Sequence, residues 1–337
     1  MATTHNIPTN AFLSQLAEVI ITTDQESVSF VVKHNATEIF NNTYTPTGGV
    51  VKLYDVDKIV EPYIGDMVFG GFSFVIDGIT QYTTVYRSNA KTNEGAETFV
   101  PSFWLTELQS KRITAIGRYE TLTMYVTLGT YVIGHAVYYK DGELIEANVQ
   151  LGQATNGQYT VDCSPKRLEN ADNGQLISYT VNAGERKQEY IVLASNPIAD
   201  PKIIFRNGFG AWDTIYFAGK KTFAPTYARS SARIGGEFRL YDVDETVTYT
   251  AHTGNLPSSY SALIADLCQS KDVFILNADG TAGDRITITD CDLKQSNQYD
   301  EVFSATITYR YASKFTGRVD GHRPPNLFDK TFDLTFN

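Results

Sequence analysis

The sequence predicts a mainly β protein made of two or three antiparallel β-sandwich or barrel-like domains, with one short helix in the C-terminal domain. With 337 residues, the chain is longer than one ordinary hydrophobic core supports. It contains 21 Tyr and 19 Phe but only 3 Met and 2 Trp, and this composition favours strands over helices. Short alternating apolar runs separated by turn residues about every eight to twelve positions indicate a sandwich or a barrel.

Prolines and turn signals divide the chain into domains. The clearest boundary is expected where Asn196-Pro197 and Asp200-Pro201 follow one another closely, because a residue before proline disfavours continuous helix. The predicted organisation is an N-terminal arm at 1–15, an N-terminal β-sandwich domain at 16–130, a middle β-domain or continuation of the first at 131–197, a C-terminal β-domain at 198–313 and a tail at 314–337. The arm is either free or docked on a neighbouring subunit, and the tail can add a strand to its own sheet or to a neighbour's.

Local patterns predict the hairpins and the helices. Asp77-Gly78 and Asp141-Gly142 stand between alternating apolar runs and predict hairpin turns. A helix is predicted at 258–270, where one apolar stripe is formed by Tyr260, Leu263, Ile264, Leu267 and Cys268. Shorter helices are predicted at 55–60, with Asp55 as N-cap and Pro62 closing it, and at 102–113.

Charge and the N-terminus bear on the partners. The net charge of −10 argues against nucleic-acid binding, because an acidic chain repels phosphate backbones. The basic pairs Lys111-Arg112 and Lys220-Lys221 are too short for a binding footprint and are interpreted as solvated strand or turn positions. The first residues lack the basic region of a signal peptide, and their apolar part is interrupted by polar residues, so no membrane span is predicted there.

The three cysteines, Cys163, Cys268 and Cys291, are odd in number and far apart in sequence. This arrangement implies no disulfide framework. Cys268 is interpreted as a buried packing residue of the predicted helix. Synthesis and folding in a reducing cytosol fit this cysteine usage best.

No motif indicates a reaction, a cofactor or a metal site. The pairs Asp55 with Asp57 and Asp242 with Asp244 could bind a cation or act as acid and base, but exposed turn carboxylates are the commoner interpretation. A weak likeness to a calcium loop, formed by Asn277, Asp279 and Asp284, lacks the Glu that such a loop needs at its twelfth position. We therefore expect no catalytic residues, no cofactor and no bound metal.

One internal echo links two distant segments. Residues 48–60 read GGVVKLYDVDKIV and residues 235–247 read GGEFRLYDVDETV. Duplication of a β-module is one explanation. Chance combined with shared strand and turn chemistry is the other.

The stretch 202–223, KIIFRNGFGAWDTIYFAGKKTF, predicts a strand, a glycine turn and a second strand. It follows the proline-marked boundary, so it is expected to form the first hairpin of the C-terminal domain. Gly208 and Gly210 would make the turn, and Trp212 would either pack there or meet a neighbouring subunit. The residues expected to serve architecture and assembly are Phe205, Asn207, Gly208, Gly210 and Trp212.

Several segments resemble a loosely defined group of β-rich structural proteins encoded by phages and prophages of Bacteroidota, including crAss-like phages. The segments that carry the resemblance are FRNGFGAWDT at 205–214, LIADLCQSKDVFIL at 263–276, DRITITDC at 284–291 and FSATITYRYA at 303–312. An F-x-V strand that leads to a Tyr-x-Pro turn is similar to Phe30-Val31-Val32 and Tyr44-Thr45-Pro46.

This resemblance implies a virion component of the tail, collar or baseplate, built as a ring of identical subunits and made in the host bacterial cytoplasm. Its implied partners are copies of itself and other virion proteins, and it implies no enzyme activity. The alternative is a receptor- or glycan-binding β-module on a phage or bacterial surface. Exposed aromatics in the loops at 87–97 and 164–174 would favour that alternative, but these loops are nearly free of them.

Overall fold

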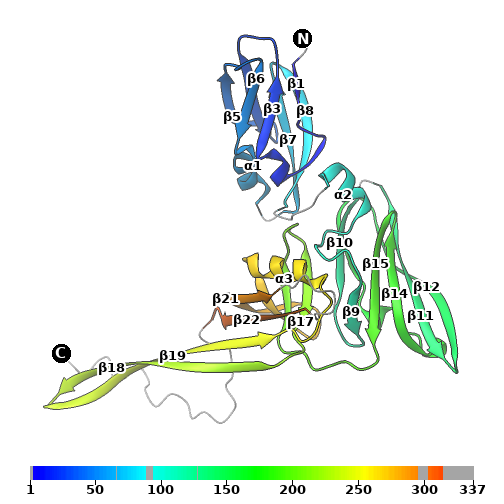
Figure 1. Cartoon of the computed structure of the whole chain (residues 1–337), viewed down its shortest axis with the longest axis vertical. Coiled ribbons are helices and arrows are strands. Elements are labelled where there is room, and N and C mark those ends of the chain that lie inside the picture. Colours follow the sequence, from blue (N-terminus) through cyan, green and yellow to red (C-terminus); the bar gives the residue numbers. More distant parts are fainter. Residues whose placement is uncertain (1–2, 66, 89–93, 127, 295–302, 314–337) are drawn as a thin grey trace.

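The computed structural model describes residues 3–65, 67–88, 94–126, 128–294 and 303–313. It is mainly β and consists of three units, each with its own hydrophobic core (Figure 1). The predicted mainly β fold with sandwich-like packing is therefore confirmed. The sheets formed by the described residues are open, so the barrel-like alternative is not found among them.

The N-terminal unit packs a three-stranded sheet of order β1-β3-β6 on a five-stranded sheet of order β2-β8-β7-β4-β5. Alternate residues of facing strands, such as Ile21 of β3 and Phe30 of β4, fill the core between the sheets. The elements are β1 (Thr4–His5), β2 (Asn10–Phe12), η1 (Leu13–Leu16), β3 (Glu18–Thr22), β4 (Val28–His34), β5 (Thr37–Tyr44), β6 (Val50–Tyr54), α1 (Val56–Ile64), β7 (Phe69–Ile76) and β8 (Ile79–Tyr86).

Two details of this unit differ from the predictions. The segment expected as an arm at 1–15 supplies β1, which pairs with β3, and β2, which pairs with β8 of the same chain. Helix α1 does not end before Pro62 but continues to Ile64. Its buried residues Val56, Val60 and Ile64 repeat every four positions, so one apolar face against the core holds the helix beyond the proline.

The middle unit packs a two-stranded sheet, β10-β13, on a five-stranded sheet of order β12-β11-β14-β15-β9. The Asp141-Gly142 hairpin joins β11 to β12, as predicted. The elements are α2 (Ala96–Ser102), β9 (Arg112–Ala115), β10 (Thr121–Val126), β11 (Thr130–Lys140), β12 (Glu143–Ala154), β13 (Gly157–Asp162), η2 (Pro165–Arg167), η3 (Ala171–Asn173), β14 (Gln175–Ala183) and β15 (Arg186–Leu193).

The chain before residue 131 does not all belong with the N-terminal sheets. Strand β9 pairs in parallel with β15, and β10 pairs with β13, so hydrogen bonding places both strands in the middle unit. The helix predicted at 102–113 is wrong. The helix there, α2, ends at Ser102, and Arg112 already lies in β9. The apolar residues of the segment 102–113 have no regular helical spacing, and in the structure they pack against different units.

The C-terminal unit is one seven-stranded sheet of order β17-β16-β20-β21-β22-β19-β18 with α3 packed on it. Figure 1 shows β18 and β19 extending as a long hairpin away from the rest of the molecule. The elements are β16 (Lys202–Arg206), β17 (Trp212–Tyr216), β18 (Lys221–Ile234), β19 (Glu237–His252), α3 (Tyr260–Gln269), β20 (Val273–Leu276), β21 (Ala282–Lys294) and β22 (Ser304–Tyr311).

Helix α3 lies within the predicted range 258–270, with Tyr260, Leu263, Ile264 and Leu267 buried. The cysteine prediction is wrong, because Cys268 and Cys291 form a disulfide that joins α3 to β21. Their distance in sequence concealed their proximity, and the odd third cysteine, Cys163, is a buried free thiol. The tail predicted at 314–337 lies outside the described residues.

The two echo segments adopt different structures. In the first, LYDVD ends strand β6 at Tyr54, and α1 begins at Val56. In the second, the same five letters at 240–244 lie within the uninterrupted strand β19. The residues that follow decide the outcome: KIVEPYI continues an amphipathic helix, whereas the Thr- and Val-rich TVTYT favours a strand. A duplicated β-module is therefore not what these segments form.

Candidate functional site

The predicted hairpin at 202–223 lies where the three units meet, and we call β16, β17 and their turn the junction hairpin. The two strands pair from Lys202 with Tyr216 to Arg206 with Trp212. In the turn, the amide oxygen of Asn207 accepts hydrogen bonds from the backbone N–H groups of Phe209 at 3.1 Å and Ala211 at 2.9 Å. Gly210 has φ +75°, a backbone conformation that residues other than glycine rarely adopt.

The turn inserts Phe209 between elements of different units. The Phe209 ring stacks on Phe99 of α2 with a centroid distance of 5.1 Å, and it lies 5.8 Å from the ring of Phe12 of β2. The same apolar cluster, which we call the junction cluster, consists of Phe12, Val68, Tyr86, Ala96, Phe99, Val100, Leu105, Phe209 and Ala211. Tyr125 of β10 packs against it from the middle unit. One turn therefore holds all three units together by burying its aromatic side chain.

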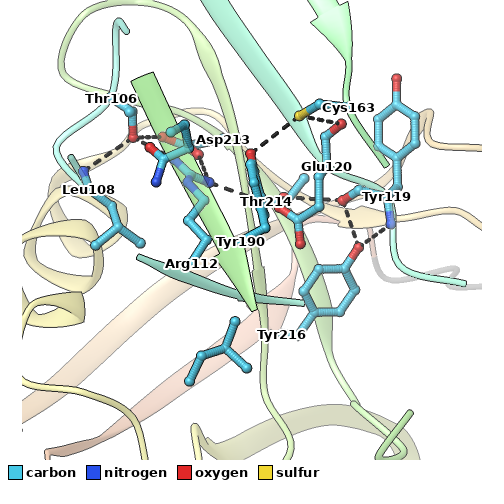
Figure 2. Close-up of polar contacts among 12 residues, drawn as sticks. Thr106, Leu108, Arg112, Tyr119, Glu120, Cys163, Tyr190, Asp213, Thr214 and Tyr216 are labelled. Carbon is cyan, nitrogen blue, oxygen red and sulfur yellow. Dashed lines mark hydrogen bonds and ion pairs between the residues drawn. The ribbon is translucent and has the colours of Figure 1, made fainter. Parts of the chain in front are cut away.

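Beside the junction cluster, a buried ion pair joins the middle and C-terminal units (Figure 2). Arg112 of β9 donates to Asp213 of β17 at 2.8 Å and, through its other terminal nitrogen, to the Thr106 hydroxyl at 2.7 Å. Thr106 in turn donates to Asp213 at 2.6 Å, and Asn207 adds a bond of 3.2 Å. Because three donors, one of them a buried cation, hold the Asp213 carboxylate, the group is suited to anchoring the units rather than to proton transfer.

Glu120 lies behind this pair, with a carboxylate oxygen 4.0 Å from Arg112. Burial raises the pKa of Glu120 to about 7, against the opposing effect of Arg112. Burial by itself lowers the pKa of Arg112, but Asp213 and Glu120 outweigh it and hold that pKa above its ordinary value. The middle and C-terminal units are also joined by Tyr216, whose hydroxyl donates to the Tyr119 carbonyl at 2.8 Å (Figure 2).

The structure brings the five residues predicted for architecture and assembly together in one hairpin. Phe205 is fully buried in the C-terminal core, and Asn207 is buried in the turn. The Gly208 N–H donates to the Asp266 carboxylate of α3 at 2.9 Å, and burial raises the pKa of Asp266 to about 7. Trp212 is half-buried, with its ring edge-on to Phe274 at 5.9 Å and Arg206 over its face.

Four important junction residues were not singled out from the sequence: Phe209, Asp213, Arg112 and Glu120. Interpreting Lys111-Arg112 as a solvated basic pair is wrong for Arg112, whose exposed fraction is 2%. Its partner Asp213 is 101 positions away, so no local spacing could reveal the pair. The useful signal was the phenylalanine between the two glycines of NGFGAW at 207–212, because a large apolar side chain stands there at a position where a solvent-exposed turn would be polar.

The remaining candidate carboxylates do not converge on a site. Asp55 adopts a left-handed conformation before α1, and Asp57 lies in that helix, whereas Asp242 and Asp244 are exposed on β19. Within the described ranges, no group of three His, Cys, Asp or Glu side chains is placed to hold a metal ion. A cavity of about 280 Å³ lies between the middle and C-terminal units, lined by Glu120, Arg118, Tyr216 and Tyr260 among others.

The other distinctive surface is the hairpin of β18 and β19, which we call the projecting hairpin. In this hairpin, directly paired residues share a face. One face is rich in apolar residues: Phe223, Pro225, Tyr227, Val243, Val247 and Tyr249. The opposite face carries small and polar residues: Thr222, Ala224, Thr226, Ala228, Thr246, Thr248 and Thr250.

The apolar face continues from the C-terminal core into solvent. At its base, Tyr249 stacks on the buried Tyr309 at 5.3 Å. Phe223, which pairs directly with Tyr249 at the base, is 70% exposed, and near the tip Phe238 is 80% exposed. Large apolar side chains exposed together on one element mark an interaction surface. This surface was not predicted, because the alternation that exposes these side chains is the same alternation that would bury them in a sandwich.

No protein-family model matches this chain, and no curated protein sequence matches it. Among the described residues, none of the helices is both long and apolar enough to cross a membrane. The structure therefore describes this protein by its architecture: three β units are joined at a buried hairpin, and a second hairpin projects into solvent.

Proposed function

We propose that this protein is a bacteriophage virion structural protein of the tail, collar or baseplate, and that it works by symmetric oligomeric assembly. The observation that carries this proposal is the projecting hairpin. An isolated two-stranded hairpin is only marginally stable in water. Among the described residues, the segment of β19 before Tyr249 pairs only with β18. At the usual rise per residue this two-stranded segment is about 40 Å long.

A hairpin of this length with an exposed apolar face is best supported by a partner that covers it. Burying Phe223, Tyr227 and Phe238 in an assembly would add the apolar packing that the single chain lacks. The rigid junction of the three units would then give each subunit one fixed shape for a repeating array. Architecture of this kind fits the resemblance to phage structural proteins and requires no active site.

The test is the oligomeric state of the purified full-length protein, measured by mass photometry over a range of concentrations and by negative-stain electron microscopy. We expect closed rings of uniform size. The double variant Phe223→Ser with Tyr227→Ser should lose the rings, because it removes apolar side chains from the exposed face. The matched control, Ala224→Ser with Ala228→Ser, changes the opposite face of the same strand and should still assemble.

The virion part of the proposal has its own test. Mass spectrometry of purified phage particles should find the protein at a fixed copy number relative to other virion proteins. A stable monomer at all concentrations that binds a polysaccharide would instead support the glycan-binding alternative and contradict the proposed assembly role.

A further inference from the structure

The two strands of the projecting hairpin carry opposite charge. Strand β18 has three basic residues, Lys221, Arg229 and Arg233, and no acidic residue. Strand β19 has one basic residue and four acidic ones, which are Glu237, Asp242, Asp244 and Glu245. Most of these residues are exposed, so the hairpin presents a basic edge and an acidic edge to solvent.

Both edges also present backbone groups that can extend the sheet. Among the described residues, β18 is the last strand of the seven-stranded sheet, and β22 reaches β19 only from Tyr249 to His252. Pro225 has no N–H to donate, which weakens strand addition near the base of β18 and leaves its outer half, from Thr226 to Ile234, as the better pairing edge.

We propose that assembly occurs by edge-to-edge strand pairing, in which the outer half of β18 of one copy pairs with the outer half of β19 of the next copy. This inference rests on the proposed assembly function and names its contact. Hairpins that point the same way around an axis place β18 antiparallel to the neighbouring β19. Residues at equal height in the two hairpins then lie opposite each other. Arg229 lies opposite the neighbour's Val243 and diagonally opposite its Glu245.

Charge decides between this arrangement and a symmetric dimer. Pairing β18 with β18 would bring arginines together, and pairing β19 with β19 would bring carboxylates together, and both are unfavourable. A β18 to β19 contact is heterologous, because the two surfaces differ, and it closes into a ring when the rotation per subunit divides a full turn. The same pairing also keeps the apolar faces of successive hairpins on one side of the extended sheet.

The test exchanges the charges of the two edges. Variant A carries Arg229→Glu with Arg233→Glu, and variant B carries Asp242→Lys with Glu245→Lys. Each variant alone has like charges on both edges, so mass photometry should show loss of the oligomer. A mixture of A and B should restore it in alternating order, and the chain with all four substitutions should assemble by itself. Circular dichroism of every variant should match the wild type, since all four positions are exposed.

The outcomes separate this inference from the function on which it rests. If the wild type stays monomeric, the proposed assembly function fails, and this contact fails with it. If the wild type forms oligomers and variants A and B do so equally well, only the edge-pairing inference is overturned, and another surface or the segment 314–337 makes the contact. If A assembles with the wild type as well as it does with B, β18 pairs with β18, because B and the wild type have the same β18, and the heterologous arrangement is wrong.

Discussion

The junction hairpin and the projecting hairpin lie at opposite ends of the same seven-stranded sheet, yet they meet different surroundings. In the first, the turn is short, and its aromatic residue Phe209 is buried among all three units. In the second, both strands run far beyond the sheet, and aromatic residues such as Phe238 face solvent. The comparison teaches that a similar alternation of apolar and polar residues buries side chains between the units in the junction hairpin and exposes them to solvent in the projecting hairpin. Substitutions in the two hairpins should therefore affect different properties.

The largest effect is expected at the buried ion pair beside the junction hairpin. Arg112→Ala leaves the Asp213 carboxylate buried without its cation, and we expect a loss of about 3–5 kcal/mol in the free energy of unfolding. Urea denaturation measures this change. The adjacent Lys111→Ala is the control, because its ion pair with Glu189 is largely exposed and should contribute about 1 kcal/mol or less. Equal effects of the two substitutions would mean that the buried pair does not anchor the units.

Phe209→Ala should cost about 3–5 kcal/mol through the cavity that it leaves in the junction cluster. Trp212→Ala should damage folding or assembly less, since Trp212 is half-buried and contacts its own unit. Thermal unfolding followed by circular dichroism compares the two variants. A Trp212→Ala variant that folds and assembles normally but loses binding to a ligand would contradict the architectural role of this hairpin.

The pH dependence of the free energy of unfolding should reveal the titration of the Glu120 carboxyl group. Its pKa is about 7 in the folded protein, against 4.5 as the ordinary value, so the folded state binds the proton more tightly than the unfolded state. The stabilisation is fully present below pH 4.5 and is lost as the pH rises through 7. Across this range we expect the wild type to lose on the order of 3 kcal/mol relative to Glu120→Gln. Parallel stability curves for the two proteins would show that Glu120 does not titrate in this way.

The smallest effect on the stability of the single chain is expected in the projecting hairpin. Because Phe223 and Tyr227 are more than half exposed, the double change to Ser should alter the free energy of unfolding of the unassembled protein by about 0.5 kcal/mol or less. Chemical denaturation at a concentration that keeps the chain monomeric provides the measurement. A large loss would place these side chains in a core of their own subunit and remove the contrast between the hairpins.

Local chemistry made part of this structure predictable. Ile203 and Phe205 formed a recognisable strand, Gly208 and Gly210 marked a turn, and the stripe around Leu263 marked α3, because each signal depends on near neighbours in the chain. The contacts that unite the three units depend instead on how the units dock. Asp213 meets Arg112 across 101 positions, and Phe209 meets Phe12 across a longer span, so no periodicity records either contact.

The echo LYDVD demonstrates the same limit within five residues. At 53–57 it ends a strand and enters a helix, and at 240–244 it remains in a strand. Tyr54 and Tyr241 have the same immediate neighbours in sequence, and both are exposed. The flanking residues and the available partner surface therefore select the structure, and a repeated motif by itself predicts neither a repeated element nor a repeated function.

The sheet order also determines how mechanical load would travel through one subunit. The projecting hairpin is joined to the rest of the sheet through four residue pairs between β19 and β22, whereas eight pairs join β22 to β21. A force that pulls the tip away from the body must cross this short ladder before it reaches the junction. Beyond it the load meets the ladders of β21 with β20 and of β20 with β16, which have three residue pairs each, so β20 rather than the base of the hairpin is the narrowest link between the tip and the junction.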